Sequence, residues 1–224
     1  MGIPERKERE KEHRREEIID AAQTVFFEKG LQVATMDEIA EAAELSKGTL
    51  YLYYKSKEDL YLAVMMRGMD VMYDKFEKVI RSNEPTIKII AGLGEAYYEF
   101  FKENREYFRM LHFFENPQVH KQVSEEMLSA CGQCNQKIWT LVVGLIQRGI
   151  DEGVIQKDIS PMQAGVILWS NANGLMRQMD RDDDYWKEKM NIDLEKTLRL
   201  SYTLLLEALM TKKAKKEYQE LALP

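Results

Sequence analysis

The fold is decided by residues 34–65, ATMDEIAEAAELSKGTLYLYYKSKEDLYLAVM. Apolar residues recur there at helical spacing in two short segments, about 37–43 and 47–54, and the intervening turn falls at Glu44. The hydroxyl of Ser46 stands just before the second segment, where an N-cap is expected. Two short helices joined by a tight turn predict a helix-turn-helix.

Helical spacing continues on both sides of this motif. We expect a first helix over about 10–30 and a fourth helix over about 57–81. Later helices are predicted over about 117–153 and 193–210. No segment alternates polar and apolar residues between hairpin turns, so the predicted fold class is all-α.

The helices change in character near residue 57. Before it they are short and joined by tight turns, whereas beyond it they are long and rich in aromatic residues and methionine, as is typical of a bundle. We therefore predict an N-terminal three-helix helix-turn-helix domain over 1–57 and a larger C-terminal helical bundle over 58–224.

Composition limits the possible partners. Hydrophobic residues make up 45% and charged residues 31% of the chain, as in globular proteins, and the net charge of −6 argues against bulk attraction to nucleic acid. Residues 1–60 hold ten lysines or arginines against fourteen acids. Residues 46–57, however, contain three lysines and no acid. Any positive surface is therefore narrow, and we expect a modest dependence of DNA binding on salt.

The N-terminal sequence MGIPERKEREKEHRREE alternates charges and lacks the apolar core of a signal peptide. No later apolar run is long enough to span a bilayer. The sequence thus predicts a cytoplasmic protein with no membrane partner.

Cys131 and Cys134 lie three residues apart, and a metal site would need further ligands, for which His112 and His120 are candidates. Both cysteines also belong to an apolar run with alternating spacings of four and three, over 127–145. That spacing is typical of a packing seam in which cysteine acts as a small hydrophobic residue. We predict reduced thiols, no metal and no cofactor.

The second helix of the motif presents a polar surface if Leu50 and Tyr54 face inward. Lysine can donate to guanine, a threonine methyl can touch thymine, and glycine allows close approach. The outward residues of this kind are Lys47, Gly48, Thr49 and Tyr53. Phosphates favour hydroxyl and ammonium groups at helix starts, for which the candidates are Thr35, Tyr51 and Lys57. The same side chains would also suit a solvated helix face.

With these residues in view, the stretch resembles the DNA-binding region of the TetR family of bacterial transcriptional regulators. The resemblance covers residues 14–66 and rests on Ile-Ala, a short turn, Ser, three variable residues, Leu-Tyr, an aromatic residue and Lys-x-Lys. By position it implies base contacts from Lys47, Gly48, Thr49 and Tyr53. It implies backbone contacts from Thr35, Ser46, Tyr51 and Lys57.

Two positions depart from the family pattern. Tyr54 replaces the usual phenylalanine, and Glu44 stands where the turn usually has glycine. A glutamate held at positive φ costs on the order of 1 kcal/mol, so the departure bears on the turn geometry more than on the fold.

The resemblance further implies that the larger part of the chain forms a ligand pocket and a dimer interface. Aromatic and methionine side chains are dense there, and they suit either a cavity for a small apolar or aromatic molecule or an ordinary core. The pocket candidates are Met65, Met69, Tyr97, Phe101, Phe108, His112, Trp139, Trp169, Asn173 and Met176.

For dimerisation, the final long helix carries a second seam with spacings of four and three, and the helix after Pro161 offers small residues. Two such helices from each subunit would form a four-helix interface. The interface candidates are Ala164, Leu168, Leu194, Leu198 and Leu205. A two-fold dimer places its recognition helices one DNA turn apart, roughly 34 Å, which predicts a palindromic operator.

The predicted function is a ligand-responsive transcriptional regulator. We expect a repressor that binds double-stranded DNA as a homodimer and is released by a small apolar or aromatic effector. An enzyme is not expected, because the three histidines lie in no acid–base motif and the sequence has no glycine-rich phosphate loop and no HExxH. Two alternatives stay open: a helical protein-interaction adaptor, and a regulator that needs a corepressor.

Overall fold

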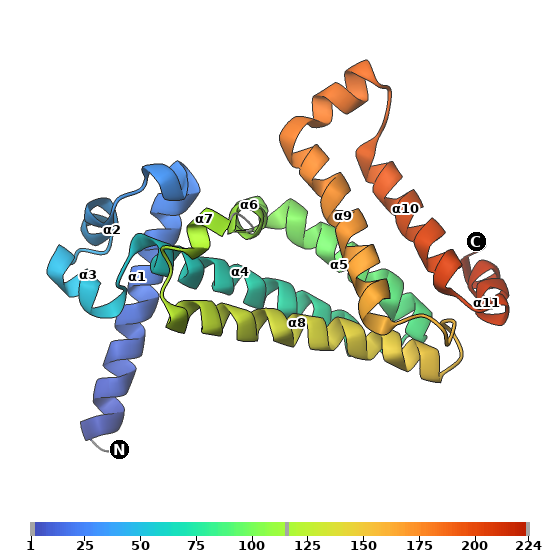
Figure 1. Cartoon of the computed structure of the whole chain (residues 1–224), viewed down its shortest axis with the longest axis horizontal. Coiled ribbons are helices and arrows are strands. Elements are labelled where there is room, and N and C mark those ends of the chain that lie inside the picture. The colour runs from blue at the N-terminus through green and yellow to red at the C-terminus, as the bar shows by residue number, and fades with distance from the viewer. Residues whose placement is uncertain (1–2, 115–116, 223–224) are drawn as a thin grey trace. The chain divides into compact units, whose positions relative to one another are not determined.

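The computed structural model describes residues 3–114 and 117–222 (Figure 1). In chain order its helices are α1 (Ile3–Val33), α2 (Met36–Ala42), α3 (Lys47–Tyr53), α4 (Lys57–Ile80), α5 (Thr86–Glu103), α6 (Arg105–Phe114), α7 (Pro117–His120), α8 (Glu125–Asp151), α9 (Pro161–Asp184), the π-helical turn η1 (Tyr185–Lys189), α10 (Leu194–Leu209) and α11 (Lys212–Ala222). The only β pairing in these residues is an isolated bridge between Ile155 and Met210. The all-α prediction is confirmed. Within the same ranges, no helix combines the length and the apolar character needed to cross a bilayer.

Both helices of the helix-turn-helix begin with a side-chain N-cap, and the cap predicted at Ser46 is confirmed. The hydroxyl of Thr35 accepts the backbone N–H of Glu38, and the carboxylate of Glu38 accepts the backbone N–H of Thr35 at 2.9 Å, which completes a capping box. Ser46 caps α3 by accepting the N–H of Thr49 at 3.1 Å. These local bonds explain why α2 and α3 begin where the sequence predicts.

The helix predicted over 117–153 is wrong, because the chain forms α7 and then a separate α8. The backbone N–H of Ser124, just before α8, donates to the carboxylate of Asp59 at 2.7 Å. Asp59 is 2% exposed and belongs to α4. A carboxylate beside a helix N-terminus is favourable, so α8 starts where this distant partner lies.

The chain divides into two compact units, one comprising residues up to Asp70 with Glu106–Asn135 and the other comprising Val71–Arg105 with residues from Gln136 onward. Both α4 and α8 contribute to each unit. The predicted boundary at residue 57 stays a prediction.

The first unit is held by an aromatic core and by one arginine. Phe26 of α1 meets Tyr61 of α4 edge to face, with ring centroids 5.3 Å apart. Arg67 of α4 donates to three side chains of α1, namely Glu16 at 2.6 Å, Asp20 at 2.6 Å and Gln23 at 3.1 Å. This network joins α1 to α4.

In the second unit α9 packs against α10 and α5 (Figure 1). The side-chain amide of Asn171 donates to the hydroxyl of Ser201 at 2.7 Å, which links α9 and α10. The outer surfaces of these two helices carry exposed apolar side chains, namely Met162, Val166, Ile167, Trp169, Leu200 and Leu204. The pair therefore has an apolar face that the chain itself leaves uncovered.

Candidate nucleic-acid interface and ligand cavity

Helix α3 rests on one buried side chain and presents the rest of its surface to solvent. Leu50 is 0% exposed and is the buried anchor of the helix. Lys47 and Gly48 are exposed, and Thr49 and Tyr53 are half-buried. All four residues predicted to contact bases therefore have accessible surface, which is the geometry that base reading requires.

Two of these side chains have local partners. The hydroxyl groups of Ser46 and Thr49 lie 2.8 Å apart, so the Thr49 hydroxyl is turned toward the cap and its methyl group is directed elsewhere. The ammonium of Lys47 donates to Asp37 of α2 at 2.8 Å, and this hydrogen bond raises the pKa of Lys47. Because that ion pair is exposed, it contributes little to stability. Lys47 can therefore exchange Asp37 for another acceptor.

The turn between α2 and α3 has the positive φ that the sequence predicts. Glu44 has φ 55°, and its N–H donates to the carbonyl of Glu41 at 3.0 Å. The N–H of Leu45 donates to the carbonyl of Ala40 at 2.8 Å. These two bonds form a Schellman motif, in which glycine is the usual residue at the position of Glu44.

Lys57 does not have the free ammonium that a phosphate contact needs. Its Nζ donates to the backbone carbonyls of Leu31 at 2.8 Å, Ala34 at 3.0 Å and Gln32 at 3.3 Å. An ammonium has three donors, and all three are engaged at the C-terminal end of α1. These bonds favour a structural role for Lys57 at the last carbonyls of α1, and its assignment to the DNA backbone stays a prediction.

The other predicted backbone contacts are Thr35, Ser46 and Tyr51. Thr35 and Ser46 use their hydroxyl groups as helix caps, whereas the exposed Tyr51 makes no such cap. Sequence reasoning missed Leu52, which is 83% exposed on the same helix. The signal was present, since Leu52 lies four residues after Gly48 and hence on the same helical face.

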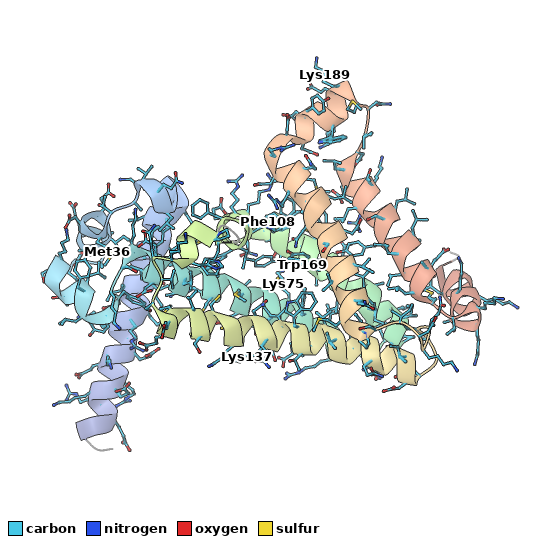
Figure 2. The ribbon with its side chains drawn as sticks, viewed as in Figure 1. Met36, Lys75, Phe108, Lys137, Trp169 and Lys189 are labelled. Atoms are coloured by element: carbon cyan, nitrogen blue, oxygen red, sulfur yellow. The ribbon has the colours of Figure 1, made fainter. Side chains whose placement is uncertain are left out.

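The second unit contains a cavity of about 80 Å³. Its walls come from α4, α5, α8, α9 and α10, and they consist of Met72, Phe76, Ile90, Leu93, Gly94, Tyr97, Ile138, Trp139, Val142, Ile146, Gly165, Leu168, Trp169, Tyr202 and Leu206. None of these residues is charged. Trp169, on α9 (Figure 2), packs edge to face with Trp139 at 6.0 Å between ring centroids. The cavity is therefore suited to an apolar or aromatic molecule.

Three of the ten predicted pocket residues line this cavity, namely Tyr97, Trp139 and Trp169. The remaining candidates lie elsewhere, and they are Met65, Met69, Phe101, Phe108, His112, Asn173 and Met176. Of these, Met65, Met69, Phe108 and His112 belong to the first unit and are not part of this site. Phe101 and Met176 are 1% and 0% exposed and fill the core of the second unit, while Asn173 contacts a wall residue.

Sequence reasoning missed the glycines that support the aromatic walls. A Cβ atom at Gly94 would lie 2.8 Å from the ring of Tyr202, and one at Gly165 would lie 3.2 Å from the ring of Trp139. Both distances are shorter than ordinary carbon contacts. The ring of Tyr202 thus occupies space that only a glycine at position 94 leaves open, and the ring of Trp139 packs tightly against Gly165. Both rings line the cavity.

One buried polar side chain is hydrogen-bonded to the cavity wall. Tyr97 donates its hydroxyl to Oδ1 of Asn173 at 2.6 Å. Asn173 is 6% exposed, and its Nδ2 has no hydrogen-bond partner. A buried amide donor is thus bonded to a wall that contains no charged side chain.

The predicted interface residues divide into two groups. Ala164, Leu194 and Leu198 are 0%, 2% and 1% exposed, so they already pack inside the chain, which argues against their assignment to the dimer interface. Leu168 lines the cavity, and Leu205 is half-buried. A seam with spacings of four and three identifies a packed face, but it does not say whether the packing partner is the same chain or another.

Cys131 is a free thiol, and it is buried. Burial raises the pKa of the Cys131 thiol to about 11, so the thiol is protonated at neutral pH. Among the described residues, no three histidine, cysteine or acidic side chains are close enough together to hold a metal ion.

The sequence of the chain is similar to those of known DNA-binding regulators. Residues 18–64 match the model of the bacterial regulatory proteins of the tetR family. The chain is 31% identical over 133 residues to the transcriptional activator FasR of Mycolicibacterium smegmatis, covering 59% of this chain and 60% of FasR. It is 26% identical over 149 residues to the transcriptional repressor KstR2 of Rhodococcus jostii, covering 66% of this chain and 71% of KstR2.

The fold is also found in a solved structure. The regulator FadR of Bacillus subtilis, determined in complex with stearoyl-CoA, superposes with a TM-score of 0.65 over 87% of this chain and 97% of FadR, at 19% identity. At this identity the likeness establishes the fold alone.

Proposed function

Because the chain belongs to the TetR family of bacterial regulatory proteins, we propose that it is a ligand-responsive transcriptional regulator that binds a palindromic operator in double-stranded DNA. The observation that carries this proposal is the surface of α3. One buried leucine anchors the helix, and a lysine, a glycine, a threonine, two tyrosines and a leucine have accessible surface around it. A helix of this kind fits the major groove.

For base reading we propose Lys47, Gly48, Thr49 and Tyr53, together with Leu52. Lys47 supplies a donor for guanine, and the methyl groups of Thr49 and Leu52 supply apolar contacts for thymine. For the DNA backbone we propose Tyr51, with Thr35 and Ser46 acting mainly through the helix N-termini that they cap.

The protein acts as a homodimer in this proposal. The support is the exposed apolar face of α9 and α10, which carries Val166, Ile167, Leu200 and Leu204. In a two-fold dimer this face of one subunit would meet the same face of the other. The residues beyond the helix-turn-helix domain, 58–224, are proposed to provide both this interface and the effector site.

The effector is proposed to occupy the cavity of the second unit and to favour a conformation that binds DNA less well. The support is the apolar lining of the cavity and the fact that α4 contributes to both units. By linkage, DNA must weaken effector binding by the same factor. FasR is described as an activator and KstR2 as a repressor, and we propose repression here. A regulator of bacterial DNA acts in the cytoplasm, and no catalytic activity is proposed.

The test is selection from a pool of randomised DNA duplexes by the purified, effector-free protein. We expect an inverted repeat to be enriched, because a two-fold dimer presents two copies of α3. Exchanging Lys47 and Thr49 together for alanine should abolish the sequence preference and leave the dimer intact. Lys55→Ala serves as the matched control, because it removes a nearby lysine outside α3.

Each other outcome has a defined meaning. Enrichment that appears only when a cell extract of small molecules is added would establish the corepressor alternative. An absence of enrichment under both conditions would refute DNA reading and favour the protein-interaction adaptor. Unchanged selection by the double variant would refute the assignment of α3 as the reading helix.

A further inference from the structure

The buried amide of Asn173 is a donor without an acceptor. Its Oδ1 accepts the hydroxyl of Tyr97 at 2.6 Å, while its Nδ2 has no partner and the residue is 6% exposed. Buried amide groups are nearly always hydrogen-bonded, because an unsatisfied donor loses its bonds to water without replacement. An unsatisfied donor therefore indicates a missing partner.

The position of Asn173 shows where that partner would come from. On α9 it lies one turn after Trp169, which lines the cavity, and thus on nearly the same helical face. The ring of Tyr97 is itself part of the wall, and its hydroxyl is bonded to the Asn173 amide. Asn173 itself is not a wall residue, but its amide is hydrogen-bonded to one, so its free N–H lies one side chain away from the cavity.

The remaining walls define the rest of the ligand. No charged side chain lines the cavity, and its lining is otherwise formed by aliphatic and aromatic groups and two glycines. A carboxylate or an ammonium enclosed there would be desolvated without a counter-ion, which is strongly unfavourable. The enclosed part of a ligand must therefore be neutral.

We propose that the cavity takes a neutral, largely apolar molecule with a single hydrogen-bond acceptor, such as a ketone or ester carbonyl, and that Nδ2 of Asn173 donates to this acceptor. The inference rests on the proposed function, since it names the chemical class of the effector for that same site. Tyr97 fixes the orientation of the amide by bonding to its Oδ1, which leaves the N–H free for the ligand.

The test measures binding of three molecules of similar shape to the full-length protein by titration calorimetry at pH 8. They are 2-acetylnaphthalene, which has a carbonyl acceptor, 2-isopropylnaphthalene, which has none, and 2-naphthoate, which is charged. We expect the ketone to bind about tenfold more tightly than the hydrocarbon, the effect of one additional buried hydrogen bond, and the carboxylate to bind most weakly.

Asn173→Leu removes the donor and keeps the volume of the side chain. In this variant the ketone and the hydrocarbon should bind with about equal affinity, and the affinity for the hydrocarbon should be that of the unmodified protein. Asn173→Ala is the second variant, in case leucine does not fit, and circular dichroism checks that both are folded. Equal affinity for ketone and hydrocarbon in the unmodified protein would overturn the proposal. So would an unchanged preference in the folded variants, tightest binding of the carboxylate, or no binding of any of the three.

The same protein preparations enter the duplex selection described above, which separates the two proposals. Selection of an inverted repeat without a ketone preference would refute only the effector class. The opposite result is also informative. If Asn173→Leu abolishes the preference for the ketone, but the unmodified protein selects no duplex with or without ligand, only the proposed function is refuted.

Discussion

Replacing Lys57 by methionine distinguishes two roles for one lysine. The sequence pattern places this side chain on the DNA backbone, whereas the structure engages its ammonium with the carbonyls of Leu31, Gln32 and Ala34. Methionine retains an apolar stem of similar length and removes the three donors. If the ammonium is structural, Lys57→Met lowers stability. If it contacts phosphate, the change lowers DNA affinity and leaves stability unaltered.

The expected loss follows from the three bonds. The bonds to Leu31 and Ala34 are part-buried, at 2.8 and 3.0 Å, and the bond to Gln32 is longer and exposed, at 3.3 Å. A hydrogen bond to a charged group contributes about 1.5–3 kcal/mol, and water can replace part of this for partly accessible carbonyls. Taking about 1 kcal/mol for each part-buried bond and little for the third, we expect the free energy of unfolding to fall by about 2 kcal/mol. In a chain of this length that corresponds to a fall in melting temperature of roughly 4–8 °C.

The assay is urea unfolding followed by circular dichroism, with Lys55→Met as the matched control. Lys55 is exposed, and the same change there should alter the free energy of unfolding by less than about 0.5 kcal/mol. The salt dependence of operator binding gives a second measurement, because loss of one phosphate contact reduces the slope of log K against log salt by about 0.9. Equal unfolding midpoints for the two variants, with a reduced slope for Lys57→Met, would refute our reasoning.

Three further perturbations test other features. Glu44→Gly should raise the free energy of unfolding by up to about 1 kcal/mol in urea titration, because it relieves the strain of a Cβ at positive φ. Glu44→Ala removes the carboxylate but keeps the Cβ, so it should not. Gly94→Ala places a methyl group against the ring of Tyr202, so it should lower the free energy of unfolding by about 1–3 kcal/mol and weaken the binding of 2-acetylnaphthalene in calorimetry. Gly174 has open space around it, so Gly174→Ala should leave this binding unchanged. Burial raises the pKa of Tyr54 to about 12. The unfolded chain loses this proton first, near pH 10, so stability should fall between about pH 10 and pH 12, and a thermal-melt series should show a smaller fall for Tyr54→Phe.

Local features of the fold were predictable from sequence because their partners are close in the chain. Thr35 and Glu38 are three residues apart, as are Ser46 and Thr49, and the bonds between them depend only on helix geometry. The positive φ of Glu44 follows from a turn of fixed length between two capped helices.

Features that depend on distant partners were not predictable. The carboxylate of Asp59 meets the start of α8, 65 residues later, and this contact divides a helix that periodicity alone makes continuous. Lys57 meets carbonyls more than twenty residues earlier. Helical spacing identifies which side chains point inward, but not which other helix they meet.

The candidate site also has one part that was predictable from the sequence and one part that was not. The exposed face of α3 follows from helical period once Leu50 is placed inside, and the sequence predicted it apart from Leu52. The cavity combines five helices, and its wall includes the rings of Tyr202 and Trp139, which pack against two glycines. Aromatic density indicated a bundle rich in rings, but a filled core and a hollow one have the same composition.

Trp169 belongs both to the cavity wall and to the uncovered apolar face of α9, with 42% of its surface exposed. A ligand that displaces this indole to gain space also alters the face available for self-association. Effector binding and self-association are then thermodynamically linked, and each changes the equilibrium constant of the other by the same factor. The apparent affinity for the effector will therefore depend on protein concentration, so the quantity of regulator in the cell would itself set the effector level at which transcription responds.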